Sequence, residues 1–142
     1  MPNHHPFDAR EEKSKLLALL VARQNDLRRR FPGRDWHTSL SGGFDVFLTF
    51  SQSDQLWYDM DKTDLQELEM RGYIIFLLGS SERFLCIPAR EICKRLSQHT
   101  THLTEHGRYM FHVADSGTSL VFRELPNWEL HGYINNLDFL KQ

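Results

Sequence analysis

Acidic residues are the first side chains of this sequence that could do chemistry, because carboxylates can hold a catalytic metal ion. Metal-dependent nucleases bring two or three carboxylates onto Mg²⁺, often beside a lysine. Asp45 and Asp59 fall on two successive predicted strands and could meet across a hairpin, but no lysine accompanies them. The Glu-x-Lys pattern of restriction endonucleases occurs only at Glu11-Glu12-Lys13, ahead of every predicted strand. A metal-dependent nuclease therefore stays a third hypothesis.

Three histidines, His99, His102 and His106, lie in the run His-Thr-Thr-His-Leu-Thr-Glu-His. On a helix this spacing would place them on one face near Cys93, and zinc accepts three histidines and a cysteine. The intervening threonines are poor helix formers, however, which favours a polar loop. We expect no cofactor, and keep the three histidines only as candidate metal ligands.

Basic residues gather at two places that could bind phosphate. One group ends the first predicted helix, with Arg34 just beyond it, and the other faces away from the apolar stripe of a later helix. If the two helix faces adjoin, they can neutralise several phosphates, for which arginine is well suited. The alternative is a solvated helix face favoured by the helix dipole. The predicted phosphate contacts are Arg28, Arg29, Arg30, Arg83, Arg90, Lys94 and Arg95.

An exposed aromatic residue could complete such a site. Trp57 and Tyr58 are neighbours on a predicted strand, so one of the two should face solvent. An exposed ring beside a basic patch can stack on a nucleic-acid base, and Trp57 is our candidate for that role. The alternative is that the ring covers an edge of the core.

Overall composition limits the other function classes. Seventeen basic and nineteen acidic residues give a net charge of −2, which argues against a globally basic nucleic-acid binder but allows a local patch. The two cysteines are too few for a disulfide framework, so we expect a cytoplasmic protein. No apolar run approaches the ~18 residues of a membrane span, and no secretory signal begins the chain. Phosphate loops, dinucleotide fingerprints and nucleophile elbows are missing from the sequence.

The most apolar part of the chain, residues 73–96, predicts the core that must position these groups. A continuous apolar run over 73–78 is typical of a strand covered on both faces. Gly-Ser-Ser-Glu then turns the chain, 83–87 forms the return strand, and Pro88 opens a helix. That helix should pack Ala89, Ile92, Cys93 and Leu96 inward.

The remaining elements predict an α+β domain. A helix over about 9–30 should be followed by a loop over 32–43, and strands 44–50 and 55–60 should pair as a hairpin. A second helix should run from about 61 to 71, and strands 108–114 and 119–125 should form another hairpin. The apolar tail should dock on the core. We therefore expect a loose arm over 1–7, then one domain over 8–142 with three helices and a mainly antiparallel sheet of about six strands in hairpins.

Part of this pattern resembles a known group of proteins. The run Tyr-Ile-Ile-Phe-Leu-Leu-Gly, then Phe-Leu-Cys-Ile-Pro-Ala-Arg-Glu-Ile, and later Gly-Arg-Tyr-Met-Phe-His-Val resembles small accessory domains of bacterial restriction and DNA-defence proteins. The likeness covers about half of the chain and rests on structural positions, so it carries over no functional residue. It implies a restriction or defence setting and a nucleic-acid partner.

The sequence thus predicts a non-catalytic module that binds DNA or another nucleic acid through an arginine-rich face. The second hypothesis, favoured by the surplus of aromatic residues and the near-neutral charge, is a protein-interaction module or homodimer. We expect no membrane partner.

Overall fold

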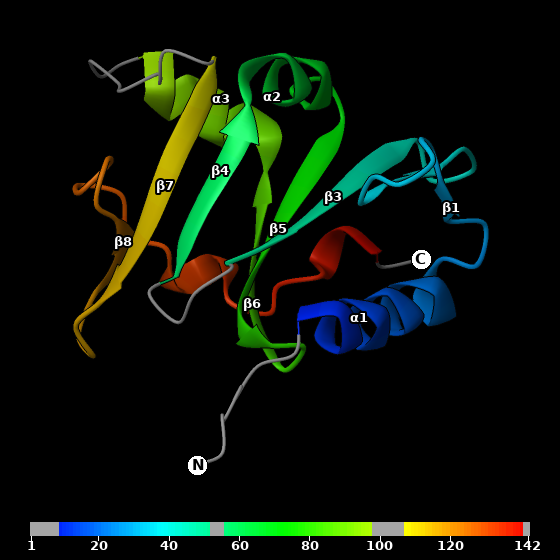
Figure 1. Ribbon diagram of the computed structural model, residues 1–142, viewed down its shortest axis with the longest axis horizontal. Coiled ribbons are helices and arrows are strands. Elements are labelled where there is room, and N and C mark those ends of the chain that lie inside the picture. Colours follow the sequence, from blue (N-terminus) through cyan, green and yellow to red (C-terminus); the bar gives the residue numbers. More distant parts are fainter. Residues whose placement is uncertain (1–8, 52–55, 98–106, 141–142) are drawn as a thin grey trace.

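The computed structural model describes residues 9–51, 56–97 and 107–140, and its largest element is a five-stranded sheet (Figure 1). The strand order in this large sheet is β1-β2-β3-β5-β6. The β3–β5 pair is parallel and the other pairs are antiparallel. Its strands are β1 (Arg28–Arg29), β2 (Trp36–Ser39), β3 (Phe44–Phe50), β5 (Gly72–Ser80) and β6 (Arg83–Pro88).

A small antiparallel sheet and three α-helices complete the described fold. The small sheet contains β4 (Trp57–Asp61), β7 (Arg108–Asp115) and β8 (Leu120–Phe122), in that order. The helices are α1 (Ala9–Arg23), α2 (Lys62–Leu68) and α3 (Ala89–Ser97), and two short 3₁₀ turns, His131–Tyr133 and Asp138–Leu140, lie in the tail. The α+β class with three helices is confirmed, but the strands form two sheets rather than one.

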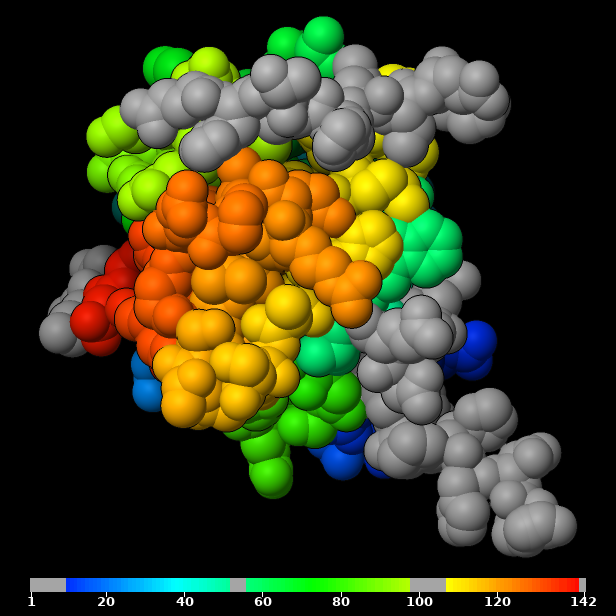
Figure 2. All heavy atoms as spheres, turned by 90° about the vertical axis from the view of Figure 1, so that its left-hand side faces the viewer, coloured from blue at the N-terminus to red at the C-terminus, as the bar shows by residue number. Residues whose placement is uncertain are grey.

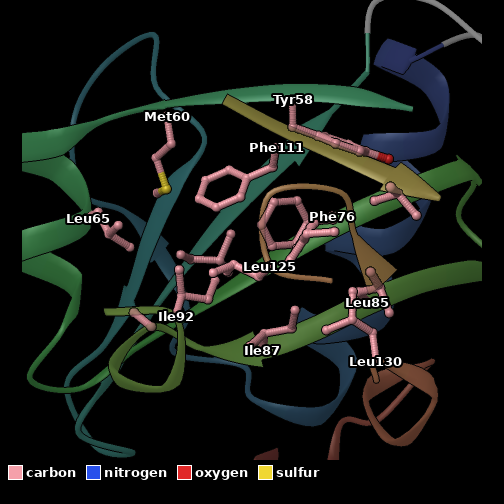
Figure 3. Packing of buried hydrophobic residues seen from close by; sticks show 14 of the residues in the cluster. Tyr58, Met60, Leu65, Phe76, Leu85, Ile87, Ile92, Phe111, Leu125 and Leu130 are labelled. Atoms are coloured by element: carbon pink, nitrogen blue, oxygen red, sulfur yellow. The ribbon is translucent and has the colours of Figure 1, made fainter. Parts of the chain in front are cut away.

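The large sheet is covered on both faces, so the domain has two apolar cores. On one face, α1 and the C-terminal segment pack against residues such as Val46 and Ile75. On the other face, the small sheet, α2 and α3 enclose Ile74 and Phe76 (Figure 3). Figure 1 shows α1 and the small sheet on opposite sides of β5. Adjacent residues of β5 therefore point into different cores, as its continuous apolar run predicts.

The predictions for the central strand pair, for the helix after it and for the docked tail are confirmed. The β5–β6 pair, α3 and the β7–β8 pair occur where the sequence indicates, and the carboxylate of Asp61 caps α2 by accepting the N–H of Thr63 at 2.8 Å. The tail is docked, since Trp128 and Leu130 are 5% and 0% exposed. Asn135 pairs with the backbone of Phe84, which ties the tail to β6.

The predicted hairpin between strands 44–50 and 55–60 is wrong. β3 pairs in parallel with β5, and β4 together with α2 forms the connection between them. The burial pattern explains this arrangement. Val46 and Phe47 enter different cores, whereas β4 alternates between exposed Trp57 and buried Tyr58. β3 therefore suits the interior of a covered sheet, and β4 suits a sheet with one solvated face.

The first helix is shorter than predicted, because it ends at Arg23 and not near residue 30. Asp26 accepts hydrogen bonds from the Ser39 hydroxyl at 2.6 Å and from the Ser41 N–H at 2.9 Å. The side chain of Gln24 also donates to Ser39, at 2.9 Å. Such side-chain bonds compete with helix formation. The chain consequently turns, and Arg28 and Arg29, which were predicted to be helical, form strand β1 against β2, which lies in the predicted loop.

His37 on β2 is a buried titratable group that links folding to pH. It is 4% exposed, and its Nδ1 has no hydrogen-bond partner among the described residues. Burial lowers the pKa of His37, and the nearby charge of Arg29 lowers it further. Below about pH 6.5 the unfolded chain takes up a proton that the folded chain resists, so stability falls as the pH decreases.

We expect His37→Leu to remove this part of the pH dependence. Urea unfolding of the wild type and the variant at about pH 7 and about pH 5 measures it. The wild type should lose more of its free energy of unfolding than the variant on acidification. Equal losses in the two proteins would contradict this interpretation of His37.

Candidate nucleic-acid interface

A buried carboxylate, Asp45 of β3, organises one end of the large sheet. Its side chain is 2% exposed and accepts hydrogen bonds from the Thr38 hydroxyl at 2.5 Å and from Nε of Arg71 at 3.2 Å. A guanidinium nitrogen of Arg30 lies 3.7 Å from the same carboxylate. The strand register explains the arrangement, because Asp45 pairs with Thr38 on one side and with Gly72 on the other. One acid thus holds two arginines that are distant in sequence.

Arg30 is fixed by further contacts. Its guanidinium lies 5.0 Å from the centre of the Phe31 ring and 5.2 Å from that of Trp36, in cation–π geometry. It also donates to Glu67 of α2 at 3.2 Å. The side chain is 35% exposed, so it remains accessible at the surface although it is held in place.

Arg71 and Arg90 line one pocket at this end of the large sheet, with a volume of about 190 Å³. The pocket lies where β3 and β5 begin and β6 ends, because Tyr73 at the start of β5 pairs with Pro88 at the end of β6. Its aromatic residues are in mutual contact: Tyr73 and Phe139 stack with ring centres 3.9 Å apart. The remaining lining residues are Gly42, Gly43, Phe44, Glu69, Met70, Gly72 and Pro88.

Helix α3 extends the positive charge beyond the pocket. Arg90 and Lys94 are four residues apart, hence on one side of the helix, and both are exposed. Within the described residues neither makes an ion pair. Arg95 differs, because its guanidinium lies 4.9 Å from the ring centre of Trp128. We call Arg30, Arg71, Arg90 and Lys94 the arginine edge.

The inward face of α3 agrees with the sequence prediction. Ala89, Ile92 and Leu96 are buried, while Cys93 is half-buried. Burial raises the pKa of the Cys93 thiol to about 11. Cys93 is therefore a protonated packing residue at neutral pH and not an activated nucleophile.

Besides Arg95, three of the predicted phosphate contacts, Arg28, Arg29 and Arg83, lie outside the arginine edge. Arg83 begins β6, whereas the pocket lies at the other end of that strand, beside Pro88. Arg83 pairs with Asp115 at 3.0 Å. Arg29 is next to Arg28 on β1 but close enough to buried His37 to lower its pKa, whereas the guanidinium of Arg28 bonds to nearby backbone carbonyl groups. The predicted basic residues therefore do not form one continuous face.

Trp57 is exposed and Tyr58 buried, as the alternation predicts, but Trp57 is also distant from the pocket. Its N–H donates to Ser51, directly after β3, and β3 ends where Phe50 pairs with Leu77. The pocket adjoins Tyr73, about 13 Å away along β5 at 3.3 Å per residue. Figure 2 looks onto the side of the molecule that carries the small sheet, where β7 is yellow. Trp57 and the arginine edge are thus at opposite ends of the large sheet.

Trp57 belongs to a separate polar cluster on the small sheet. Its ring is stacked on His112, with ring centres 5.9 Å apart and planes within 5° of parallel. Glu124 binds both the N–H and Nδ1 of His112, at 2.8 and 2.5 Å. The ring of Trp57 therefore already has a stacking partner within the chain.

The carboxylates do not converge as a nuclease requires. Asp45 and Asp59 belong to different sheets, so the expected meeting across a hairpin is wrong. Asp59 instead accepts two hydrogen bonds from Arg108, at 2.9 and 3.2 Å. No group of three potential metal ligands occurs in the part of the chain that the structure describes. His99, His102 and His106 lie outside the described residues.

A second, larger pocket of about 630 Å³ lies between α2 and the two sheets. It contains two arginines, but each is paired with an acid: Arg34 with Asp64, and Arg108 with Asp59 and Asp61. The pKa of Asp61 is lowered chiefly by the hydrogen bond from the Thr63 N–H. Its lining has three acids, Asp35, Asp61 and Asp64, against two arginines, so this pocket offers no excess positive charge to an anion.

Arg71 is the important residue that sequence reasoning missed. It stands alone between Met70 and Gly72, outside both basic groups. The usable signal was Asp45, an acid within a mostly apolar strand. A carboxylate buried in a covered sheet requires a cationic or hydrogen-bonding partner, which directs attention to arginines beside the neighbouring strands.

No family model, curated protein or solved structure matches this chain. Among the described residues, no helix is long and apolar enough to cross a membrane. Because no matching protein indicates a function, a function has to be argued from the arginine edge and its pocket.

We expect Asp45→Ala to lower the free energy of unfolding by about 2 kcal/mol, because hydrogen bonds to charged groups contribute about 1.5–3 kcal/mol. Asp59→Ala is the matched control: its carboxylate is 46% exposed, and exposed ion pairs contribute at most about 1 kcal/mol. Urea unfolding of both variants gives the comparison. A loss at Asp45 no larger than that at Asp59 would mean that Asp45 does not anchor this end of the sheet.

Proposed function

We propose that the domain is a non-catalytic module that binds nucleic acid through the arginine edge. The observation that carries the proposal is the pocket shared by Arg71 and Arg90, since Arg90 makes no ion pair in the described part of the chain and Arg71 shares the carboxylate of Asp45 with Arg30. The exposed guanidinium groups can each take a phosphate oxygen.

The charge balance at this end of the sheet supports an anionic partner. Arg30, Arg71, Arg90 and Lys94 are accompanied by four acids: buried Asp45, Glu67 bound to Arg30, Glu69 at the pocket and Glu91 on α3. Because Asp45 is nearly inaccessible to solvent, four accessible cations face three accessible acids. A chain with an overall charge of −2 thus has a small local excess of accessible positive charge.

The spacing of the cations favours a polymer over a single small anion. Arg30 directly follows β1, and Arg71 lies between α2 and β5. Arg90 and Lys94 are on successive turns of α3. Such a row can follow several phosphates of one backbone. The restriction or DNA-defence setting implied by the sequence resemblance stays a prediction.

We expect the protein to bind a fluorescent oligonucleotide at low salt and to release it as the salt concentration increases. If four cations each contact a phosphate of a single strand, the slope of log K against log salt should be about −3. Fluorescence anisotropy between about 50 and about 200 mM salt measures this slope. Absence of binding at the lowest salt concentration would reject the proposed function.

Charge reversal locates the binding surface. Arg90→Glu should weaken oligonucleotide binding and reduce the steepness of the slope by about 1. Arg123→Glu is the matched control, because Arg123 is exposed in the turn directly after β8 and also makes no ion pair within the described ranges. If both reversals weaken binding equally, the attraction reflects overall charge and not the arginine edge.

A protein-interaction module is the second candidate, and two side chains favour it. Leu40 and Met70 are 83% and 85% exposed, and they lie on the turns at the same end of the large sheet as the pocket. Exposed apolar residues beside arginines are common at protein interfaces. Light scattering that gives a dimer mass for the wild type and a monomer mass for Met70→Glu would support self-association through this surface.

A further inference from the structure

The pocket of the arginine edge combines aromatic and cationic groups in a way that phosphate binding alone does not require. Phe44 meets the ring of Phe139 edge-on at 5.0 Å, and Phe139 stacks on Tyr73 at 3.9 Å. Tyr73 and Phe139 are only half-buried, so part of this aromatic cluster is accessible from the pocket. Arg71 and Arg90 lie on the same lining.

Charge decides what can enter the pocket. Glu69 also lines it and, within the described residues, makes no ion pair. Its carboxylate repels a phosphate inside the pocket but not an uncharged ring. Arg71 and Arg90 can hold phosphates, while the space beside Glu69 and the aromatic residues suits a neutral planar group.

Size restricts the occupant further. The pocket holds about 190 Å³, below the roughly 300–1,000 Å³ of pockets that enclose drug-sized ligands. That space suits one ring system and not a whole nucleotide. Unpaired bases commonly stack on aromatic side chains or on arginine guanidinium planes, and both groups are present here.

We propose that this pocket accepts one unpaired base of a single-stranded nucleic acid while the arginine edge holds the flanking phosphates. The inference rests on the proposed function and adds a preference for single strands. A regular duplex keeps its bases paired and stacked, so placing one in the pocket would first require unstacking. Met70, on the pocket rim and 85% exposed, is free to adjust its side chain to the bound ring.

An abasic strand separates base binding from phosphate binding. Fluorescence anisotropy is measured for a single strand of about 12 nucleotides, for the same backbone without bases, and for the corresponding duplex. We expect the complete strand to bind at least about fivefold more tightly than the abasic strand, the factor for a weak base–aromatic stack. It should also bind more tightly than the duplex.

A substitution in the pocket supplies the second measurement. Phe139→Leu keeps an apolar side chain but removes a stacked ring, so it should weaken binding of the complete strand and leave the abasic strand unchanged. Phe50→Leu is the matched control, because Phe50 is a half-buried aromatic residue on the same face of the large sheet, outside the pocket. It should change neither affinity.

The outcomes distinguish the two proposals. Equal, salt-sensitive binding of the complete and abasic strands would overturn the base pocket and leave phosphate binding intact. Tighter binding of the duplex would also overturn it. Failure of every oligonucleotide to bind at low salt would reject the proposed function itself. Loss of abasic-strand binding in Phe139→Leu would show that the substitution disturbs the arginine edge, and would overturn the assigned role of the ring.

Discussion

The buried carboxylate of Asp45 is the interaction on which this end of the molecule depends. A charge removed from water is costly unless oppositely charged or hydrogen-bonding groups surround it. Here Thr38 supplies a hydroxyl, and Arg30 and Arg71 supply two guanidinium groups, from three different parts of the chain. The carboxylate therefore joins β2, β3 and the α2–β5 connection. Because it is nearly inaccessible to solvent, it positions both arginines without presenting its own negative charge to a ligand.

The parallel pairing of β3 with β5 makes this arrangement possible. A hairpin between β3 and β4 would have separated Asp45 from Arg71, whereas the crossover through β4 and α2 returns the chain beside β3 at Gly72. The next strand, β6, brings Arg90 to the same end of the sheet. The topology thus brings together Asp45 of β3, Arg71 before β5 and Arg90 after β6. The aromatic residues of the pocket come from β3, from β5 and from the docked tail. The tail therefore contributes to the site as well as to the core.

Sequence patterns predicted the fold where local signals decide it. The apolar run of β5, the turn before Arg83 and the helix after Pro88 all contain their information within a few residues. The partner of β3 could not be predicted in this way, because pairing between distant strands leaves no local pattern. The end of α1 was missed since it depends on Asp26 binding serines that are more than ten residues later. For the candidate site, Arg30, Arg90 and Lys94 were recognised from charge clustering, but Arg71 is isolated in sequence. Trp57 and Arg83 were grouped with them only because the sequence cannot show that they lie at the other end of the sheet.

The central claim is that the end of the large sheet around Asp45 is the ligand-binding surface, and amide chemical shifts test it most directly. Isotope-labelled protein is titrated with a short single-stranded oligonucleotide and followed by two-dimensional NMR. We predict that the largest shifts occur at residues 42–44, 70–73 and 90–94, and that Trp57 and His112 remain unchanged. Shifts centred on Trp57, His112 and Arg123, with none around Arg71, would contradict the claim and place the binding surface on the small sheet.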